Sequence, residues 1–272
     1  MADWGPWVGD YLGASCECSP TPGASAHTKG AWSYSVTDTN RADGLLVTFE
    51  WEQNYTTIRT LLFDVGIGAG SDILINNLMV CPPAGGAAVS RAGEISVFFP
   101  VSVPPDQIRM RSQSSMASHA TTYALTKKLI SGLPTVGSVV DTYGVDTANT
   151  KGTTLTAPNN PSQYGSWTQI AASTNRIKAL VFAIGHGQAD MTTFSDQYFD
   201  LSIGIGAAGS EVELAEFLQA GGSSQTTKTL SPGYLGPLYV DIPEGTRLSA
   251  RVRKQWNSAS QRTLDVVIYG VR

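Results

Sequence analysis

The chain contains one glycine pattern whose spacing could support nucleotide chemistry. Residues 204–209 read GIGAAG and match G-x-G-x-x-G, in which a strand, a glycine turn and a helix hold the pyrophosphate of a dinucleotide. A similar stretch at residues 66–70 reads GIGAG and breaks that spacing. Because β-type sequence surrounds both stretches, we interpret these glycines as bend or turn residues rather than as a nucleotide site.

Histidine and acidic residues offer two further candidates. His186 lies four positions before Asp190, which could place a base near a carboxylate, but no nucleophile motif accompanies the pair. A group of acids could supply the oxygen ligands that calcium prefers. These acids are Asp190, Asp196, Asp200, Glu211 and Glu213. Their spacing lacks the regular alternation of a calcium loop, so the sequence predicts no catalytic, cofactor-binding or metal-binding residue, no cofactor and no enzyme.

Composition excludes other classes of protein. Only 15% of the 272 residues are charged, against a typical ~25%, and the net charge of −4 gives no basic surface for nucleic acid. No apolar run approaches the ~20 residues of a membrane span, so no membrane insertion is expected. The first residues lack the basic and apolar regions of a signal peptide. Three sparse cysteines, Cys16, Cys18 and Cys81, predict reduced thiols and folding in a cytoplasm.

The two halves of the chain repeat one another. Residues 30–49 (GAWSYSVTDTNRADGLLVTF) resemble residues 165–184 (GSWTQIAASTNRIKALVFAI), with Trp32 matching Trp167 at a separation of 135 residues. Further matches keep the same order while the separation drifts to 140 residues. These are 66–68 with 204–206, 70–73 with 209–212, 101–104 with 240–243, and Arg111 with Arg251. An unchanged order with so small a drift indicates an internal duplication.

Each copy is also predicted to begin alike. Residues 26–30 read AHTKG and residues 148–152 read ANTKG. In the second copy residues 153–164 (TTLTAPNNPSQY) then intervene, and their composition predicts a loop. The expected organisation is an arm at 1–25, a first domain at 26–131, a linker at 132–147 and a second domain at 148–272.

Each copy reads as β structure. Runs rich in Val, Ile, Leu, Phe, Tyr and Thr are separated by clusters of turn-forming residues. The predicted strands are 32–37, 45–52, 58–67, 72–79, 94–103, 107–113 and 121–130, then 167–172, 177–185, 197–205, 211–219, 234–242, 246–253 and 262–271. Residues 210–218 also suit a helix, but their counterpart at 71–79 looks like a strand, so both are predicted to be strands. The fold class is therefore all-β, with two tandem jelly-roll-like β-sandwich domains from an internal duplication and an N-terminal extended arm.

The arm carries the candidate interaction residues. Trp4, Trp7, Tyr11 and Leu12 are large apolar residues, and residues 13–25 are rich in Gly, Ala, Ser, Pro and Cys. An apolar tip on a flexible tether suits docking into a groove on a neighbouring subunit. The alternative is that the tip folds back over its own domain.

Aromatic residues at predicted strand ends and in loops are a second candidate for binding. Rings in such places can stack on sugars or on a partner protein. They are Trp51, Tyr55, Tyr198 and Trp256. The alternative is that these rings cap the ends of the sandwiches.

The paired motifs A-x-T-K-G, G-x-W, I-G-I-G-A-x-G-S and V-x-I-P resemble a family of tailed-bacteriophage virion structural proteins, tail- or fibre-associated. The resemblance covers about residues 26–272 and implies a β-sandwich unit placed in the virion, with no known catalytic residues. In the second copy Lys-Gly and Gly-Ser-Trp are separated, which departs from the pattern.

The predicted function is that of a bacteriophage virion structural protein, made in the host bacterial cytoplasm. Its expected partners are other virion proteins and itself, as a trimer or hexamer that covers the edge strands of the sandwiches. A capsid decoration or cement protein is one alternative. A carbohydrate-binding receptor-recognition module, with a host surface glycan as ligand, is the alternative from another class.

Overall fold

The computed structural model describes most of the chain between residues 16 and 272. The described residues are 16–18, 20–37, 41–51, 60–70, 72–81, 84–85, 93–117, 123–129, 135–161, 163–186, 197–224, 227–231, 233–255 and 262–272. This part of the chain forms strands and contains no helix. It therefore confirms the all-β fold class.

All fourteen predicted strands are present, with ends shifted by a few residues. In the first half the strands are β1 (Cys16–Cys18), β2 (Ser33–Thr37), β3 (Gly44–Trp51), β4 (Leu61–Ile67), β5 (Ile73–Val80), β6 (Ala84–Gly85), β7 (Gly93–Phe99), β8 (Gln107–Ser114) and β9 (Tyr123–Leu129). The remaining strands are β10 (Val140–Tyr143), β11 (Val145–Asp146), β12 (Lys151–Ala157), β13 (Thr168–Ala171), β14 (Ile177–His186), β15 (Gln197–Ile205), β16 (Val212–Ser224), β17 (Thr227–Ser231), β18 (Tyr234–Ile242), β19 (Leu248–Lys254) and β20 (Arg262–Val271). The segment that also suited a helix is strand β16.

The strands form two sandwiches of the same topology. Sheet I has the strand order β1-β9-β3-β7, and sheet II has β2-β8-β4-β5. In the second half, sheet III contains β12-β20-β14-β18 and sheet IV contains β13-β19-β15-β16, so each strand has a counterpart at the same place. Two tandem sandwiches with one strand order are what the internal duplication predicts.

Equivalent backbone contacts recur in the two copies. The N–H of Gly68 donates to the carbonyl of Gln107, and the N–H of Gly206 donates to that of Arg247. Both glycines have positive φ, +67° and +112°, which residues with a Cβ rarely adopt. The glycines of the nucleotide-like pattern therefore form the end of β15 and its turn into β16, in keeping with their interpretation as turn residues.

The structure corrects the predicted start of each copy. Gly30 donates its N–H to the carbonyl of Ser112, and its structural counterpart is Gly165, which donates to Val252. Gly152 instead lies in β12, paired with β11 and beside β20. The two Thr-Lys-Gly patterns are therefore not equivalent, and residues 151–157 form an edge strand rather than a loop because their backbone completes sheet III.

Two predicted non-domain segments also contribute strands. Residues 16–18 were expected to belong to the arm, but as β1 they pair with β9 at the edge of sheet I. Residues 140–143 and 145–146 were expected to form a linker, but as β10 and β11 they pair with β20 and β12. In both cases an edge strand offered free backbone groups that the neighbouring segment satisfies.

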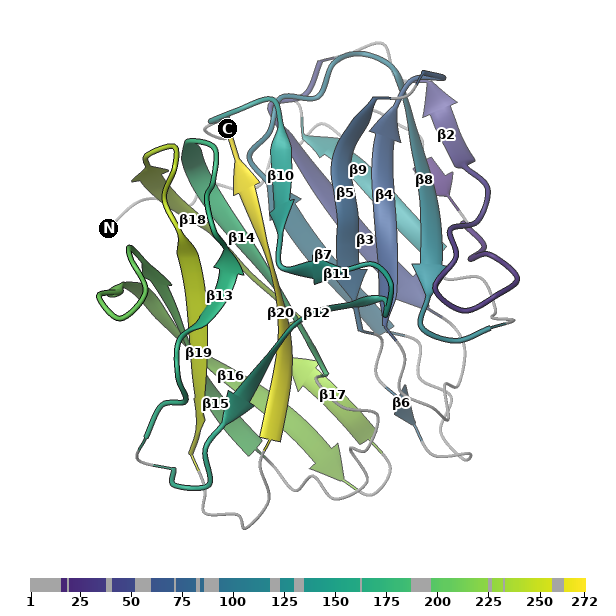
Figure 1. The fold of residues 1–272 in the computed structure, drawn as a ribbon. Coiled ribbons are helices and arrows are strands. Elements are labelled where there is room, and N and C mark those ends of the chain that lie inside the picture. Colours follow the sequence, from purple (N-terminus) through teal and green to yellow (C-terminus); the bar gives the residue numbers. More distant parts are fainter. Residues whose placement is uncertain are drawn as a thin grey trace, which may run out of the picture.

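Sheet III is buried on both faces, and this joins the two sandwiches. Along β20, Val266 and Ile268 belong to the core shared with sheet IV, whereas Val267 and Tyr269 belong to the core of the first sandwich. The edge strands β5 and β7 of the first sandwich lie against β10, β14 and β18 (Figure 1). The first sandwich is therefore closed at this edge by the outer face of sheet III.

Two tyrosine hydroxyls satisfy the free backbone edge of β5. The hydroxyl of Tyr269 accepts the N–H of Met79 at 2.7 Å and donates to the carbonyl of Asn77 at 3.0 Å. Tyr234 donates its hydroxyl to the carbonyl of Met79. Burial raises the pKa of both phenols, so they stay neutral donors. These contacts replace the neighbouring strand that an edge would otherwise need.

The first half also extends a sheet of the second half. Strand β6 pairs with β17, which lies next to β16 in sheet IV. The described part of the chain thus joins its halves by a common core, by tyrosine hydrogen bonds and by one strand pairing. We infer that the halves behave as a single body.

Replacing Tyr269 by Phe should destabilise the whole chain. The substitution leaves a buried N–H and a buried carbonyl of β5 without partners, which should lower the free energy of unfolding by about 2 kcal/mol. Urea denaturation followed by tryptophan fluorescence measures this. Tyr239→Phe is the matched control, because Tyr239 is 46% exposed and should tolerate the loss of its hydroxyl. Equal stability of the two variants would contradict the role of Tyr269.

Candidate functional site

The sequence-predicted interaction residues are not placed by the structure. Trp4, Trp7, Tyr11 and Leu12 lie outside the described residues. The same holds for Tyr55 and Trp256 and for the side chains of Trp51 and Tyr198. Binding by these aromatic residues stays a prediction.

The predicted acids are not gathered into one site where they are described. Asp200 pairs with Arg253, Glu211 with Arg247, and Glu213 with Arg251. Asp190 and Asp196 lie outside the described residues. In the described part of the chain, no group of three or more His, Cys, Asp or Glu residues is placed to hold a metal ion.

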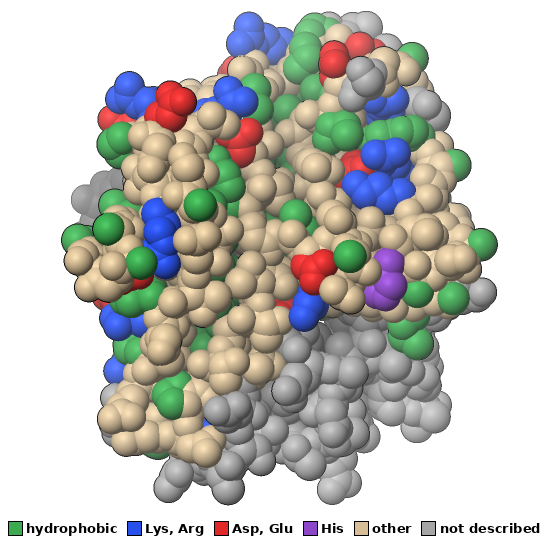
Figure 2. Space-filling view, in the orientation of Figure 1, with side chains coloured by type: hydrophobic (Ala, Val, Ile, Leu, Met, Phe, Trp, Pro, Cys, Tyr) green, Lys and Arg blue, Asp and Glu red, His purple; other side chains and the backbone are tan. Residues whose placement is uncertain are grey.

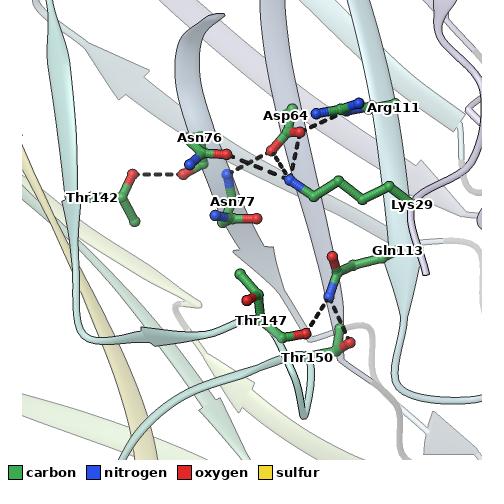
Figure 3. Close-up of polar contacts among 9 residues, drawn as sticks. All are labelled: Lys29, Asp64, Asn76, Asn77, Arg111, Gln113, Thr142, Thr147 and Thr150. Atoms are coloured by element: carbon green, nitrogen blue, oxygen red, sulfur yellow. Dashed lines mark hydrogen bonds and ion pairs between the residues drawn. The ribbon is translucent and has the colours of Figure 1, made fainter. Parts of the chain in front are cut away.

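One polar cluster centres on Asp64 of β4, whose side chain is fully buried. Lys29 donates its Nζ to both carboxylate oxygens, at 2.5 and 2.6 Å, and Arg111 donates its Nε at 2.7 Å (Figure 3). The backbone N–H of Asn77 adds a third donor at 3.0 Å. Sequence comparison of the copies missed this cluster, because the position that matches Asp64 in the second copy is Ser202.

A bulge in β5 creates this arrangement. Phe63 pairs with Leu78 and Val65 pairs with Ile75, so two residues of β5, Asn76 and Asn77, lie opposite Asp64. Asn77 has a φ of +54°, which asparagine tolerates better than most residues. The bulge turns its N–H out of the ladder toward the carboxylate. The Asn-Asn pair in an otherwise apolar strand was the sequence signal from which this bulge could have been predicted.

The same bulge contacts the second half of the chain. The carbonyl of Asn77 accepts the hydroxyl of Tyr269, and the carbonyl of Asn76 accepts that of Thr142 in β10. Gln113 donates its amide to the carbonyl of Thr147 and to the hydroxyl of Thr150 (Figure 3). The Asp64 cluster and the junction between the halves are therefore linked through one irregular stretch of backbone.

Trp32 covers the arginines of the cluster. The guanidinium carbons of Arg109 and Arg111 lie 4.3 and 4.6 Å from the centroid of its ring. Both arginines come from β8, two positions apart, so they project from the same face of sheet II. The arrangement is a cation–π stack at the outer surface of the first sandwich.

The second copy has a related stack in which more of the charge is neutralised. Arg251 lies over Trp167 and Tyr164, at 4.2 and 4.4 Å, and donates to Glu213. Ile73, an exposed apolar residue, stands in the first copy where the second has Glu213, since Gly66 pairs with Ile73 and its counterpart Gly204 pairs with Glu213. The duplicates thus keep the arginine and the indole but differ in the carboxylate.

The charges of the two outer faces differ as a result. The described part of sheet II and its loops presents Lys29, Arg109 and Arg111 against Asp64 and the loop residues Asp72 and Asp106. The corresponding part of sheet IV presents Arg247, Arg251 and Arg253 against Asp200, Glu211, Glu213 and Glu216. The first face therefore carries equal numbers of positive and negative charges, and the second carries an excess of negative charge. Elsewhere, Figure 2 shows acidic and basic side chains next to one another, without a large field of one sign.

A second buried carboxyl lies in sheet III. Burial raises the pKa of Asp265 to about 6, against the opposing effects of a hydrogen bond from Thr154 and of the nearby Lys151. Asp265 lies in β20, opposite Thr154 of β12. This carboxyl titrates in a range where an ordinary aspartate is already ionised.

A groove of about 540 Å³ lies at one end of the first sandwich. The β4–β5 turn, the β7–β8 connection and residues 138–139 form its walls. It contains the charged residues Arg41, Asp72 and Asp106 and two exposed apolar residues, Ile73 and Val139. Its lining is mixed and shows no paired catalytic groups among the described residues.

Comparisons with known proteins identify no family. No protein-family model and no curated protein sequence matches the chain. The structure is similar to the N-terminal CBM22-1-CBM22-2 tandem domain of Xyn10C from Paenibacillus barcinonensis, with 10% identity, a TM-score of 0.26, and coverage of 94% of this chain and 87% of that one. It is also similar to a structure of infectious bursal disease virus Gt strain, with 12% identity, a TM-score of 0.27, and coverage of 97% and 69%.

The described residues contain no helix that is long and apolar enough to cross a membrane.

Replacing Asp64 by Asn should strongly destabilise the chain. The variant leaves Lys29 and Arg111 without their carboxylate in a largely buried setting, and removing one partner of a buried ion pair costs about 3–5 kcal/mol. The free energy of unfolding in urea measures the loss. Asp241→Asn is the control, because Asp241 pairs with Arg176 at the surface and its loss should leave stability unchanged. A mild effect of Asp64→Asn would show that the cluster does not hold the bulge.

Replacing Asp265 by Asn should change how stability depends on pH. A folded-state pKa of about 6, raised from 3.8, means that the proton stabilises the fold and that this stabilisation is lost as pH rises from about 4 through 6. Asn cannot ionise, so the variant should match the natural protein at pH 4 and exceed it at pH 8 by up to about 3 kcal/mol. Denaturation curves at both pH values test this. A difference that does not change with pH would rule out the assignment.

Proposed function

We propose that this chain is a structural protein of a bacteriophage particle, associated with the tail or fibre and assembled there as a homo-oligomer with other virion proteins. The observation that carries the proposal is the burial of sheet III on both faces. It turns two sandwiches into one body without a flexible hinge in the described junction. A rigid building block of this kind suits a repeating assembly better than a pair of independently moving modules.

Free strand edges support assembly with further copies. The inner edges at β5 and β16 are covered by tyrosines and by β17. At the opposite side, the described residues place no strand against the outer edge of β2 or of β13. An exposed edge can pair with a strand or loop of a neighbouring subunit, which would cover it in the particle.

The N-terminal residues supply the proposed attachment. Trp4, Trp7, Tyr11 and Leu12 precede β1, whose pairing with β9 fixes the chain at the edge of sheet I. An apolar segment that starts from a fixed edge can reach a groove of a neighbouring subunit. The arm of the proposal therefore ends before β1, rather than at residue 25.

The alternative location is the head of the particle, where the chain would be a capsid decoration or cement protein. A rigid pair of sandwiches suits that location as well. Imaging purified particles by cryo-electron microscopy distinguishes the two, since it places the chain on the tail or on the shell directly. Absence of the chain from purified particles by mass spectrometry would overturn the proposal as a whole.

Two truncations should separate attachment from folding. Removing residues 1–15 should leave the melting temperature unchanged and prevent incorporation into particles. Removing residues 1–25 also deletes β1 and the hydrogen bond from Ser112 to the carbonyl of Pro20, so this variant should melt several degrees lower. Thermal melting and quantification of the chain in purified particles are the measurements. Normal incorporation of the shorter truncation would refute the attachment role.

A further inference from the structure

The outer face of sheet II holds hydrogen-bond donors that no described acceptor uses. Arg111 donates only its Nε to Asp64, so Nη1 and Nη2 make no hydrogen bond to a described residue. The same is true of Nδ2 of Asn76, whose Oδ1 already accepts from Lys29, and of Nε1 of Trp32. The unused acceptor of this cluster, Oδ1 of Asn77, is buried, whereas the unused groups of Arg111, Asn76 and Trp32 are donors, so the complement of these three side chains is a group made of acceptors.

Charge points to the same kind of ligand. Asp64 is fully buried and receives both Lys29 and Arg111, so one negative charge faces two positive ones. Arg109 adds a third cation, which is 3% exposed and bonds only to two backbone carbonyls of the β4–β5 turn, at 3.5 Å each. Its Nε has no partner. Asp72 and Asp106 lie on the turns next to Arg109, so the excess of positive charge is local to Lys29 and Arg111, where a further negative charge would be stabilised.

The second copy shows how such an arginine is otherwise satisfied. At the place that corresponds to Arg111, Arg251 keeps the stack on its tryptophan and donates Nη2 to Glu213 at 3.1 Å. The first copy has the apolar residue Ile73 at the position of that glutamate, because Gly66 pairs with Ile73 as its counterpart Gly204 pairs with Glu213. The two copies thus share the cation and the indole, and only the second supplies the carboxylate from within the chain.

The donors are accessible but recessed. The side chains of Lys29 and Arg111 are 24% and 29% exposed, and Asn76 lies on the surface beside them (Figure 3). A narrow ligand reaches such donors more easily than the broad face of another sandwich does. The two terminal nitrogens of an arginine guanidinium can donate in parallel to the two oxygens of one carboxylate.

We propose that Arg111, Lys29, Asn76 and Trp32 form a binding site for the carboxylate of an acidic saccharide. The two terminal nitrogens of Arg111 bind the carboxylate, the charge of the Lys29 ammonium attracts it, and the amide of Asn76 and the indole donate to ring oxygens. The site does not rest on the proposed place in a virus particle, since it follows from the side chains of a single copy.

Calorimetric titration of the full chain with glucuronate tests the site, with glucose as the neutral probe and with ionic strength held constant. Glucuronate should bind with one site per chain, and glucose should not bind detectably. Arg111→Lys keeps a cation for Asp64 but removes the fork, and it should weaken glucuronate binding at least fivefold. Arg251→Lys, the same change in the other copy, should leave the affinity for glucuronate unchanged, because Arg251 already forms an ion pair with Glu213.

Asn76→Asp provides a second variant at an exposed position, where folding is not at risk. It places a carboxylate beside Lys29 and Arg111, so it should abolish glucuronate binding without lowering the melting temperature. Equal binding of glucose, an equal loss in Arg251→Lys, or unchanged affinity in both site variants would overturn the proposal. A third outcome is that the chain does not bind glucuronate but self-associates at low salt, and that Asn76→Asp removes this self-association. The ligand of the site would then be a carboxylate of a second copy, and the saccharide assignment would be wrong.

Discussion

The bulge at Asn76 and Asn77 is the constraint on which the junction depends. At this point β5 leaves the regular ladder, and its backbone bonds in two directions at once, to Asp64 inside the first sandwich and to Tyr269 and Thr142 of the second half. In a regular strand, these backbone N–H and carbonyl groups would pair within the sheet or stay unpaired at its edge. The irregularity therefore decides both where the cations of sheet II gather and how the halves meet.

Sheet III adds the apolar part of the same junction. It has two hydrophobic faces and a partner on each, whereas sheet I has its core on the side of sheet II. The ring of Tyr269 packs edge-on against the ring of Phe99, with 5.6 Å between the ring centroids, while its hydroxyl forms hydrogen bonds with the backbone of β5. Apolar contact and hydrogen bonding are thus combined in one side chain.

Sequence alone predicted the fold class and all fourteen of the longer repeated strands, because period-two patterning and turn residues are local signals. It also predicted the matching glycines at 68 and 206, which share a backbone conformation that few other residues adopt. It missed the other six strands, which are β1, β6, β10, β11, β12 and β17. The residues of these strands pair with segments that lie far away in the sequence, so no local pattern marks them. One signal was overlooked: the run Val266–Tyr269 is apolar at consecutive positions, which predicts burial on both faces. The Asp64 cluster had no repeated counterpart, so comparison of the copies could not reveal it.

The two-faced sheet has a consequence for the history of the chain. Immediately after a duplication, each copy can fold alone and either can be lost. Once the second copy acquired an apolar outer face, and the first came to use that face as its wall, neither could be deleted without exposing a core. The duplicates are therefore no longer interchangeable modules, and recombination within this gene should be tolerated only where it keeps both halves together and in this order.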